Sequence, residues 1–272
     1  MFEFLKKKEA VKTPSIDLNS PVKAVMQKKV ESTTPFKPAI EVAERMAEKN
    51  IGSLIVTDPQ VPAGIITERD FYRKISAKGI NLKGLKAFHL MNHPLYCIRE
   101  DTSIQKAAEY MSRKRIRRLP VVHSGQLKGI VSETDIIRVY EGMDCRVEVE
   151  AVMTPHVVTA GSWYSISKIS RLMREKKVGS VVLLKDEAIQ GFITERDILH
   201  KVLVKGGNSD DLKARDVMTK KVIFIGPQAT LTQAAALMHE KRIRRVPVLR
   251  DDKLEGLLSQ TDLVDYLASQ TV

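Results

Sequence analysis

A fourfold internal repeat is the feature of this sequence that most constrains its fold. The string Gly-apolar-apolar-Ser/Thr-x-x-Asp occurs four times, at residues 64–70, 129–135, 191–197 and 256–262. Ahead of each copy lies a set with the i, i+3, i+4, i+7 spacing of a helix, fully apolar in three copies and with Ser170 at one position in the other. Each set ends in a methionine: Met46, Met111, Met173 and Met238. Every methionine precedes the aspartate of its copy by 24 residues. Four gapless copies predict four structural units of one kind.

Within each unit the pattern predicts a helix, a strand, a turn, a second strand and a second helix. Short runs of apolar, largely β-branched residues follow the first helix, at 54–56, 121–122, 181–183 and 248–249. The second helix is expected to open at the Ser/Thr of the motif. A further short apolar segment precedes each unit, at 25–26, 90–91, 152–153 and 217–218. Helices and strands mixed in this way predict an α+β fold.

The units alternate in kind. Units one and three carry Gly52-Ser53 and Gly179-Ser180 and end in Ile-Thr-Glu-Arg-Asp, whereas units two and four carry Arg-Arg-x-Pro-Val at 117–121 and 244–248. A unit of about 60 residues buries only a modest fraction of its surface, so two small sheets are expected to pack together. We therefore expect a basic tail at 1–19, a first pair at 20–142 and a second pair at 143–272.

The charge of the chain is uneven. Residues 1–140 carry 25 Lys+Arg against 15 Asp+Glu, a net of +10, while residues 141–272 carry 20 against 18, a net of +2. Such an excess can concentrate polyanions, and it is also typical of surfaces rich in solvated lysines. The first twenty residues lack the apolar core of a signal peptide, and no stretch is apolar enough to span a bilayer, so a cytoplasmic protein is expected.

No arrangement of residues indicates catalysis. The two cysteines, Cys97 and Cys145, share no metal-type spacing and are interpreted as structural thiols. The six histidines fall in no shared motif and lack the partners of a zinc hydrolase or an activated nucleophile. We expect neither a catalytic residue nor a bound metal.

These motifs resemble the cystathionine-beta-synthase (CBS) domain over almost the whole chain, from about residue 20 to residue 268. The Val-Met-Thr-Pro opening at 152–155, the Arg-Arg-Leu-Pro-Val string and the Ile-Thr-Glu-Arg-Asp string have the family's form and order. The resemblance implies two tandem CBS pairs, or Bateman modules, each with clefts for adenosine-containing ligands such as AMP, ADP, ATP or S-adenosylmethionine. The four-copy layout is similar to the gamma subunit of AMP-activated protein kinase and to stand-alone archaeal CBS proteins.

The resemblance also implies which residues bind the ligand. The motif aspartates would accept hydrogen bonds from the ribose hydroxyls: Asp70, Asp135, Asp197 and Asp262. The motif hydroxyls, at the start of the second helices, would face phosphate: Thr67, Ser132, Thr194 and Ser259. Ser/Thr-x-x-Asp at a helix start is equally a capping arrangement, and one residue can serve both purposes.

Two arginine pairs, Arg117-Arg118 and Arg244-Arg245, distinguish the candidate sites better than the aspartate motif does, because only units two and four carry them. Neighbouring side chains on a strand point to opposite faces, so one arginine of each pair can enter a cleft and bind phosphate. The alternative is a solvated edge or a salt bridge to Glu133 or Asp135. The glycines at 52 and 179 suit close approach of a ligand but supply no charge.

Three features depart from the family's pattern. Gln27-Lys28 stands where Thr-Pro is usual, and residues 35–38 form an unusual helix entry, so the site of unit one is the most doubtful. The single tryptophan, Trp163, is interpreted as a packing or interface residue rather than an adenine stack.

Two functions follow from these observations. The first is a non-catalytic regulatory sensor that binds an adenosine-type molecule and signals to a separate protein effector, with a homodimer expected. The alternative is a factor that binds RNA or the ribosome, gated by nucleotide, through basic residues of the first half: Lys6, Lys7, Lys8, Lys28, Lys29, Arg113, Lys114 and Arg115.

Overall fold

The computed structural model describes residues 16–58, 61–75, 82–186 and 188–270, and within them the four predicted units are present. Unit one comprises β1 (Ser32–Thr33), α1 (Ala39–Glu48), β2 (Ser53–Asp58), β3 (Val61–Thr67) and α2 (Glu68–Ile75). Unit two comprises β4 (Ile98–Arg99), α4 (Ile104–Lys114), β5 (Arg118–His123), β6 (Gln126–Ser132), α5 (Glu133–Ile136) and the 3-10 helix η2 (Ile137–Gly142).

Units three and four repeat this order. Unit three comprises β7 (Thr159–Gly161), α6 (Ile166–Glu175), β8 (Ser180–Lys185), β9 (Ala188–Thr194), α7 (Glu195–Ile198) and the π-helical turn η4 (Leu199–Leu203). Unit four comprises α9 (Leu231–Glu240), β10 (Arg245–Arg250), β11 (Lys253–Ser259) and α10 (Gln260–Ser269). The α+β fold with small sheets is confirmed, and the structure adds the short first strand of units one to three.

Each sheet follows the same topology. The first short strand runs parallel to the second, and the second pairs antiparallel with the third, as in β1-β2-β3. In unit four the parallel strand is reduced to one bridge, between Ile225 and Val248. A register shift precedes the turn of every hairpin, after Val56, Val121, Leu183 and Val248. The repetition of this bulge shows that the four sheets are copies in detail.

The opening segments are exchanged between the two units of a pair. The segment around the 3-10 helix η1 (Val22–Ala24) precedes unit one but packs on unit two, where Gln27 bridges to Ile130. Conversely, the segment of helix α3 (Ala87–Leu90) packs on unit one, where Asn92 bridges to Ile65. The segments of η3 (Val149–Ala151) and α8 (Ala214–Val217) are exchanged between units three and four in the same way. This exchange ties units one and two, and units three and four, into two modules.

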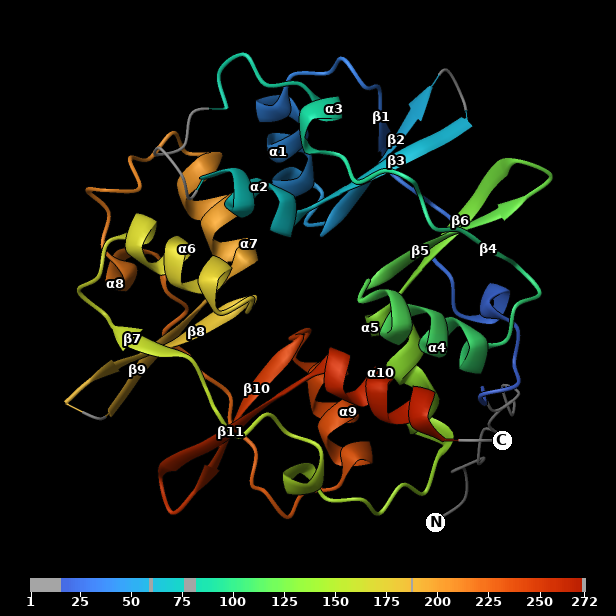
Figure 1. Ribbon diagram of the computed structural model, residues 1–272. Helices are drawn as coiled ribbons and strands as arrows, with labels where there is room; N and C mark the ends of the chain where they lie inside the picture. The colour runs from blue at the N-terminus through green and yellow to red at the C-terminus, as the bar shows by residue number, and fades with distance from the viewer. Residues whose placement is uncertain (1–15, 59–60, 76–81, 187, 271–272) are drawn as a thin grey trace, which may run out of the picture.

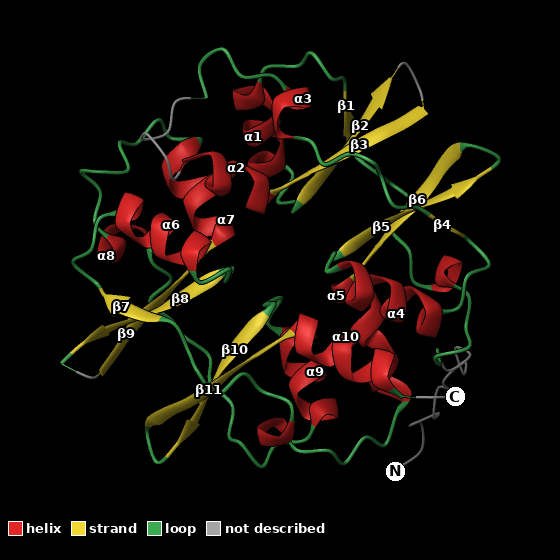
Figure 2. Ribbon diagram, in the orientation of Figure 1, coloured by secondary structure: helices red, strands yellow, loops and turns green. Residues whose placement is uncertain are grey.

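Helices connect the two modules. The four units surround a common centre, with helices of units one and three gathered on one side and helices of units two and four on the opposite side (Figure 1). Figure 2 shows the hairpins lying between these helical groups. One buried core combines apolar residues of units two and four, such as Met111 and Leu263, and the other combines units one and three, such as Met46 and Ile198. Each helical core therefore contains residues of both modules. The expected packing of two small sheets within a pair did not predict this sharing.

Candidate functional sites

Four cavities surround the four motif aspartates. Their volumes are about 750 Å³ at Asp262, 280 Å³ at Asp70, 250 Å³ at Asp197 and 370 Å³ at Asp135. Each cavity lies where the motif strand ends, and an exchanged opening segment forms part of its wall, such as Thr154 in the Asp262 cavity. The repeat thus produces four equivalent positions with different linings.

The motif hydroxyls cap the following helices. In every unit, Oδ2 of the aspartate accepts hydrogen bonds from the backbone N–H and the hydroxyl of the Ser/Thr three residues earlier. At Ser259 and Asp262 both distances are 2.7 Å. The hydroxyl protons of Thr67, Ser132, Thr194 and Ser259 are engaged in these bonds, so none is offered to a phosphate in this conformation.

The second carboxylate oxygen separates the sites into two classes. Oδ1 of Asp135 accepts from Nε2 of Gln27 at 2.8 Å. Oδ1 of Asp197 accepts from Nζ of Lys201 at 2.6 Å and from the hydroxyl of Thr219 at 3.2 Å. Within the described part of the chain, Oδ1 of Asp70 and Oδ1 of Asp262 accept no hydrogen bond. Among the described side chains, therefore, Asp135 and Asp197 are engaged by the protein itself, whereas Asp70 and Asp262 keep one oxygen without such a partner.

Gln27 changes a different site from the one that the sequence suggested. Because the opening segments are exchanged, Gln27 lies against Asp135 of unit two rather than in the site of unit one. The corresponding position beside Asp70 is taken by residues 92–94. The departure from the family's pattern at Gln27 therefore affects the site of unit two, not the site of unit one.

Two reciprocal sets of ion pairs join the modules near the centre. Glu195 of unit three binds Arg117 of unit two and Arg69 of unit one, each at 2.8 Å. Glu68 of unit one binds Arg244 of unit four at 2.8 Å and Arg196 of unit three at 2.7 Å. The alternative of a salt bridge to Glu133 or Asp135 is not found among the described residues. The carboxylates that bind Arg117 and Arg244 come from the opposite module instead.

The buried charges stabilise one another. Burial raises the pKa of Glu195, but Arg117 and Arg69 outweigh it and hold that pKa at about 2. Burial likewise opposes ionisation of Glu68, and Arg244 holds its pKa far below the usual range. Both glutamates are therefore ionised at neutral pH. The sequence analysis missed them, although the Glu-Arg dipeptide that units one and three share was a visible signal.

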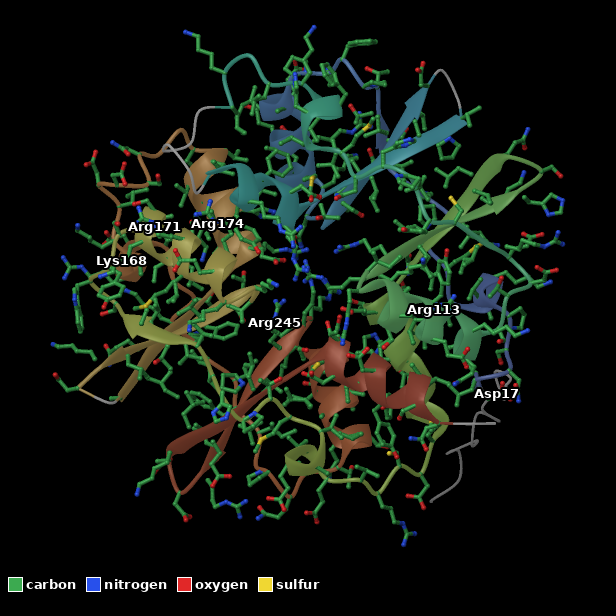
Figure 3. The ribbon with its side chains drawn as sticks, in the orientation of Figure 1. Asp17, Arg113, Lys168, Arg171, Arg174 and Arg245 are labelled. Carbon is green, nitrogen blue, oxygen red and sulfur yellow. The ribbon has the colours of Figure 1, made fainter. Side chains whose placement is uncertain are left out.

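The other arginine of each pair lacks such a partner. Arg118 and Arg245 form no ion pair among the described residues, and their guanidinium groups lie against Gly52 and Gly179, where a Cβ would clash with them. Burial and a neighbouring arginine lower the pKa of each to about 10. The glycines thus admit arginine side chains of the chain itself. Figure 3 shows nitrogen atoms gathered at the centre of the molecule, close to Arg245.

We call Arg117, Arg118, Arg244 and Arg245 the central arginine cluster. Together with Arg69 and Arg196 it supplies six cations, against three buried glutamates, Glu68, Glu133 and Glu195. Burial raises the pKa of Glu133, which weakens its contribution as an anion. A buried excess of positive charge is unfavourable unless an anion compensates it. The centre is therefore suited to bind negatively charged groups.

The remaining predicted residues lie outside the central arginine cluster, although Arg115 and Lys29 line cavities. Lys28, Lys29, Arg113, Lys114 and Arg115 are exposed, whereas Lys6, Lys7 and Lys8 lie outside the described residues. Trp163 is 57% exposed, packs over Gly161 and meets the edge of Tyr164, and it lines none of the four cavities.

No group of three or more His, Cys, Asp or Glu side chains in the described ranges is arranged to hold a metal ion. Among the helices that the structure describes, none is long and apolar enough to cross a membrane.

The family model of the CBS domain matches four segments of the chain, at residues 22–77, 86–142, 149–204 and 214–269. These segments coincide with the four structural units and span most of the sequence. The chain is a CBS-domain protein. CBS pairs are regulatory, ligand-binding modules that are generally non-catalytic.

Relatives and solved structures agree with this assignment. The CBS protein is 29% identical to the uncharacterized protein MJ1404 of Methanocaldococcus jannaschii over 92% of its own length and 62% of that protein. It is 38% identical over 46% of its length to the uncharacterized protein MK0525 of Methanopyrus kandleri, covering 65% of that chain. The chain thus spans somewhat less than two thirds of these relatives.

The fold matches two solved archaeal structures along 91% of the chain. MJ1225 of Methanocaldococcus jannaschii, a proposed archaeal homologue of g-AMPK, superposes with a TM-score of 0.81 at 19% identity over its whole length. An uncharacterized conserved protein of Pyrococcus horikoshii gives a TM-score of 0.63 at 23% identity over 99% of its length. Both similarities show the fold alone, including the arrangement of the four units.

Proposed function

We propose that this CBS protein is a non-catalytic sensor of an adenosine-containing ligand, with the ligand's sugar at Asp262 or Asp70 and its phosphate directed at the central arginine cluster. The observation that carries this proposal is the free Oδ1 of Asp262 in a cavity that also contains Arg245 and Arg117. A carboxylate and guanidinium groups in one cavity match the hydroxyls and phosphate of a nucleotide.

The sugar contact is supported by the geometry of Asp262. Its Oδ2 is fixed by Ser259, so the carboxylate is held in one orientation with Oδ1 directed elsewhere. Burial raises the pKa of Asp262, which indicates that its charge is incompletely compensated by the protein. Two ribose hydroxyls would donate to this carboxylate and stabilise it.

The charge of the centre separates the two ligand classes that the sequence left open. S-adenosylmethionine carries a positive sulfonium. It would add positive charge to a cavity that already holds Arg245, which has no ion-pair partner among the described residues. A nucleotide brings negative phosphate to the same place. We therefore favour AMP, ADP or ATP over S-adenosylmethionine.

Titration calorimetry with AMP and S-adenosylmethionine tests this proposal. We expect AMP to bind and S-adenosylmethionine to bind at least about ten-fold more weakly, since one charge-assisted hydrogen bond contributes on this scale. Asp262→Asn should remove binding at one site, while the exposed Asp101→Asn is the matched control. Undiminished binding by Asp262→Asn, or tighter binding of S-adenosylmethionine, contradicts the proposal.

Signalling is proposed to act through the ion pairs that join the modules. Arg117 lines the Asp262 and Asp70 cavities and also binds Glu195 across the module boundary. A phosphate that attracts Arg117 competes with Glu195, so ligand binding alters the contact between modules. A separate protein effector would detect this change. The helical faces of the modules are already covered within one chain, so the proposed homodimer requires another surface.

The RNA-binding alternative has one structural observation in its favour. Arg113 lies over the ring of Tyr110 at 5.5 Å, and Lys114 lies over the ring of Tyr96 at 5.0 Å. Exposed cations beside aromatic rings suit single-stranded RNA. RNA affinity that falls steeply with salt and depends on Arg113 supports this alternative, whereas salt-independent or absent binding removes it.

A further inference from the structure

The Asp262 cavity is large, and more basic side chains line it than one phosphate group needs as partners. Its volume of about 750 Å³ exceeds the 280 Å³ of the Asp70 cavity, the other site whose aspartate Oδ1 accepts no hydrogen bond from the described side chains. Both modules contribute to its wall. The basic residues that line it are Arg69, Arg73, Arg115 and Arg117 from module 1, and Arg174, Lys177 and Arg245 from module 2. Seven cations converge on one cavity that contains Asp262, Asp265 and Glu133 as acids.

Two of these cations occupy strained backbone positions. One residue just after the first helix of each unit is left-handed, with φ of 52° at Asn50, 54° at Arg115, 56° at Lys177 and 53° at Arg242. This region favours glycine and asparagine, and only unit one has asparagine there. Strained residues are concentrated at ligand sites, where function compensates the cost. Arg115 and Lys177 line the Asp262 cavity.

Neither Arg115 nor Lys177 forms a strong interaction with another side chain among the described residues. Arg115 pairs with Asp265 at 3.2 Å, but its side chain is 79% exposed, and exposed ion pairs contribute little because water screens them. Lys177 forms no ion pair or side-chain hydrogen bond among the described residues. Both side chains are therefore available to a ligand.

We propose that the Asp262 cavity is selective for a nucleoside polyphosphate. The sugar lies at Asp262, the first phosphate at the central arginine cluster, and the further phosphates are bound by Lys177 and Arg115. The smaller Asp70 cavity shares Arg115 with this site but not Lys177 or Arg174. Lys177 and Arg174 are therefore among the residues that distinguish the two sites, and Lys177 is the exposed one of the two. This inference rests on the proposed function, because it refines the ligand of one of its sites.

The test uses the full-length chain carrying Asp70→Asn, which removes the sugar contact of the second candidate site. Calorimetry with AMP, ADP and ATP is expected to give affinity that rises with phosphate number, with ATP at least about ten-fold tighter than AMP. Lys177→Ala should weaken ATP binding about ten-fold and change AMP binding less than about two-fold. Lys176→Ala is the matched control, because Lys176 is exposed and lines none of the cavities.

The outcomes separate this inference from the proposed function. Equal affinity for AMP and ATP, or an equal loss for both in Lys177→Ala, overturns the polyphosphate assignment while the sensor proposal stands. Failure of every adenosine nucleotide to bind overturns both. Retention of folding is established for each variant by its melting temperature, and Lys177 is exposed, so the substitution leaves the core intact.

Discussion

Arg117 and Glu195 form an ion pair across the boundary between the two modules, with 2.8 Å between Nη2 and Oε2. The Glu195 side chain is only 3% exposed and that of Arg117 is 15% exposed. The pair belongs to a reciprocal arrangement, since Arg244 and Glu68 form the equivalent contact in the opposite direction. The arrangement joins the modules with the same arginines that face the candidate ligand sites.

Substitution of Arg117 by alanine is expected to destabilise the ligand-free protein by about 3 kcal/mol or more, because Glu195 is left buried with fewer compensating charges. Urea unfolding measures the change. Arg99→Ala is the control, because Arg99 pairs with Asp101 at a site where both side chains are largely exposed, and it should have a much smaller effect. Equal effects of the two substitutions contradict the role of the buried pair.

Stability is expected to fall in acid through Glu195. Its pKa of about 2 in the folded chain lies below the ordinary value of 4.5, so its contribution is complete above about pH 4.5 and is lost as the pH falls toward 2. The free energy of unfolding of Glu195→Gln should therefore decline less steeply over this interval than that of the wild type. Parallel curves for the two proteins would show that Glu195 titrates normally.

Alanine at Gly179 is expected to weaken nucleotide binding about ten-fold, because the added Cβ meets the guanidinium of Arg245 and lies 2.8 Å from Oε1 of Glu195. Displacing Arg245 removes one phosphate contact. Gly226→Ala is the matched control, since nothing lies within 4 Å of a Cβ there. Calorimetry measures the nucleotide affinity of both variants. Unchanged affinity in Gly179→Ala argues against Arg245 as a phosphate ligand.

Replacement of Gln27 by alanine is expected to raise the number of nucleotides bound per chain by one, because Oδ1 of Asp135 loses its hydrogen bond from Gln27 and becomes available. Equilibrium dialysis measures the stoichiometry. Lys28→Ala, at the neighbouring exposed position, should leave the number unchanged. If Gln27→Ala also leaves the number of bound nucleotides unchanged, the hydrogen bond from Gln27 to Asp135 is not what prevents binding at this site.

The sequence predicted the units well because each contains its own signals. The apolar spacing that ends at Met111 and the capping Ser132–Asp135 pair are local features, and local features determine where helices and strands begin. The exchange of the opening segments was not predicted, because the segment at Gln27 contacts Ile130 about 100 residues away. Nothing in a local pattern specifies which neighbour such a segment will cover.

The candidate sites were predicted in part for a similar reason. The four aspartates and both arginine pairs do lie at the cavities, since the motif places them at strand and helix ends. The partner of Arg117 was missed, because Glu195 comes from the other module and their pairing depends on how the modules assemble. The distinction between Asp262 and Asp197 also required coordinates, because it depends on Lys201 and Thr219.

A crystal structure of the protein grown with AMP tests the account most directly. We expect electron density for the sugar against Oδ1 of Asp262 and of Asp70, with phosphate at the central arginine cluster. Density at Asp135 and Asp197 with the other two cavities empty would contradict it.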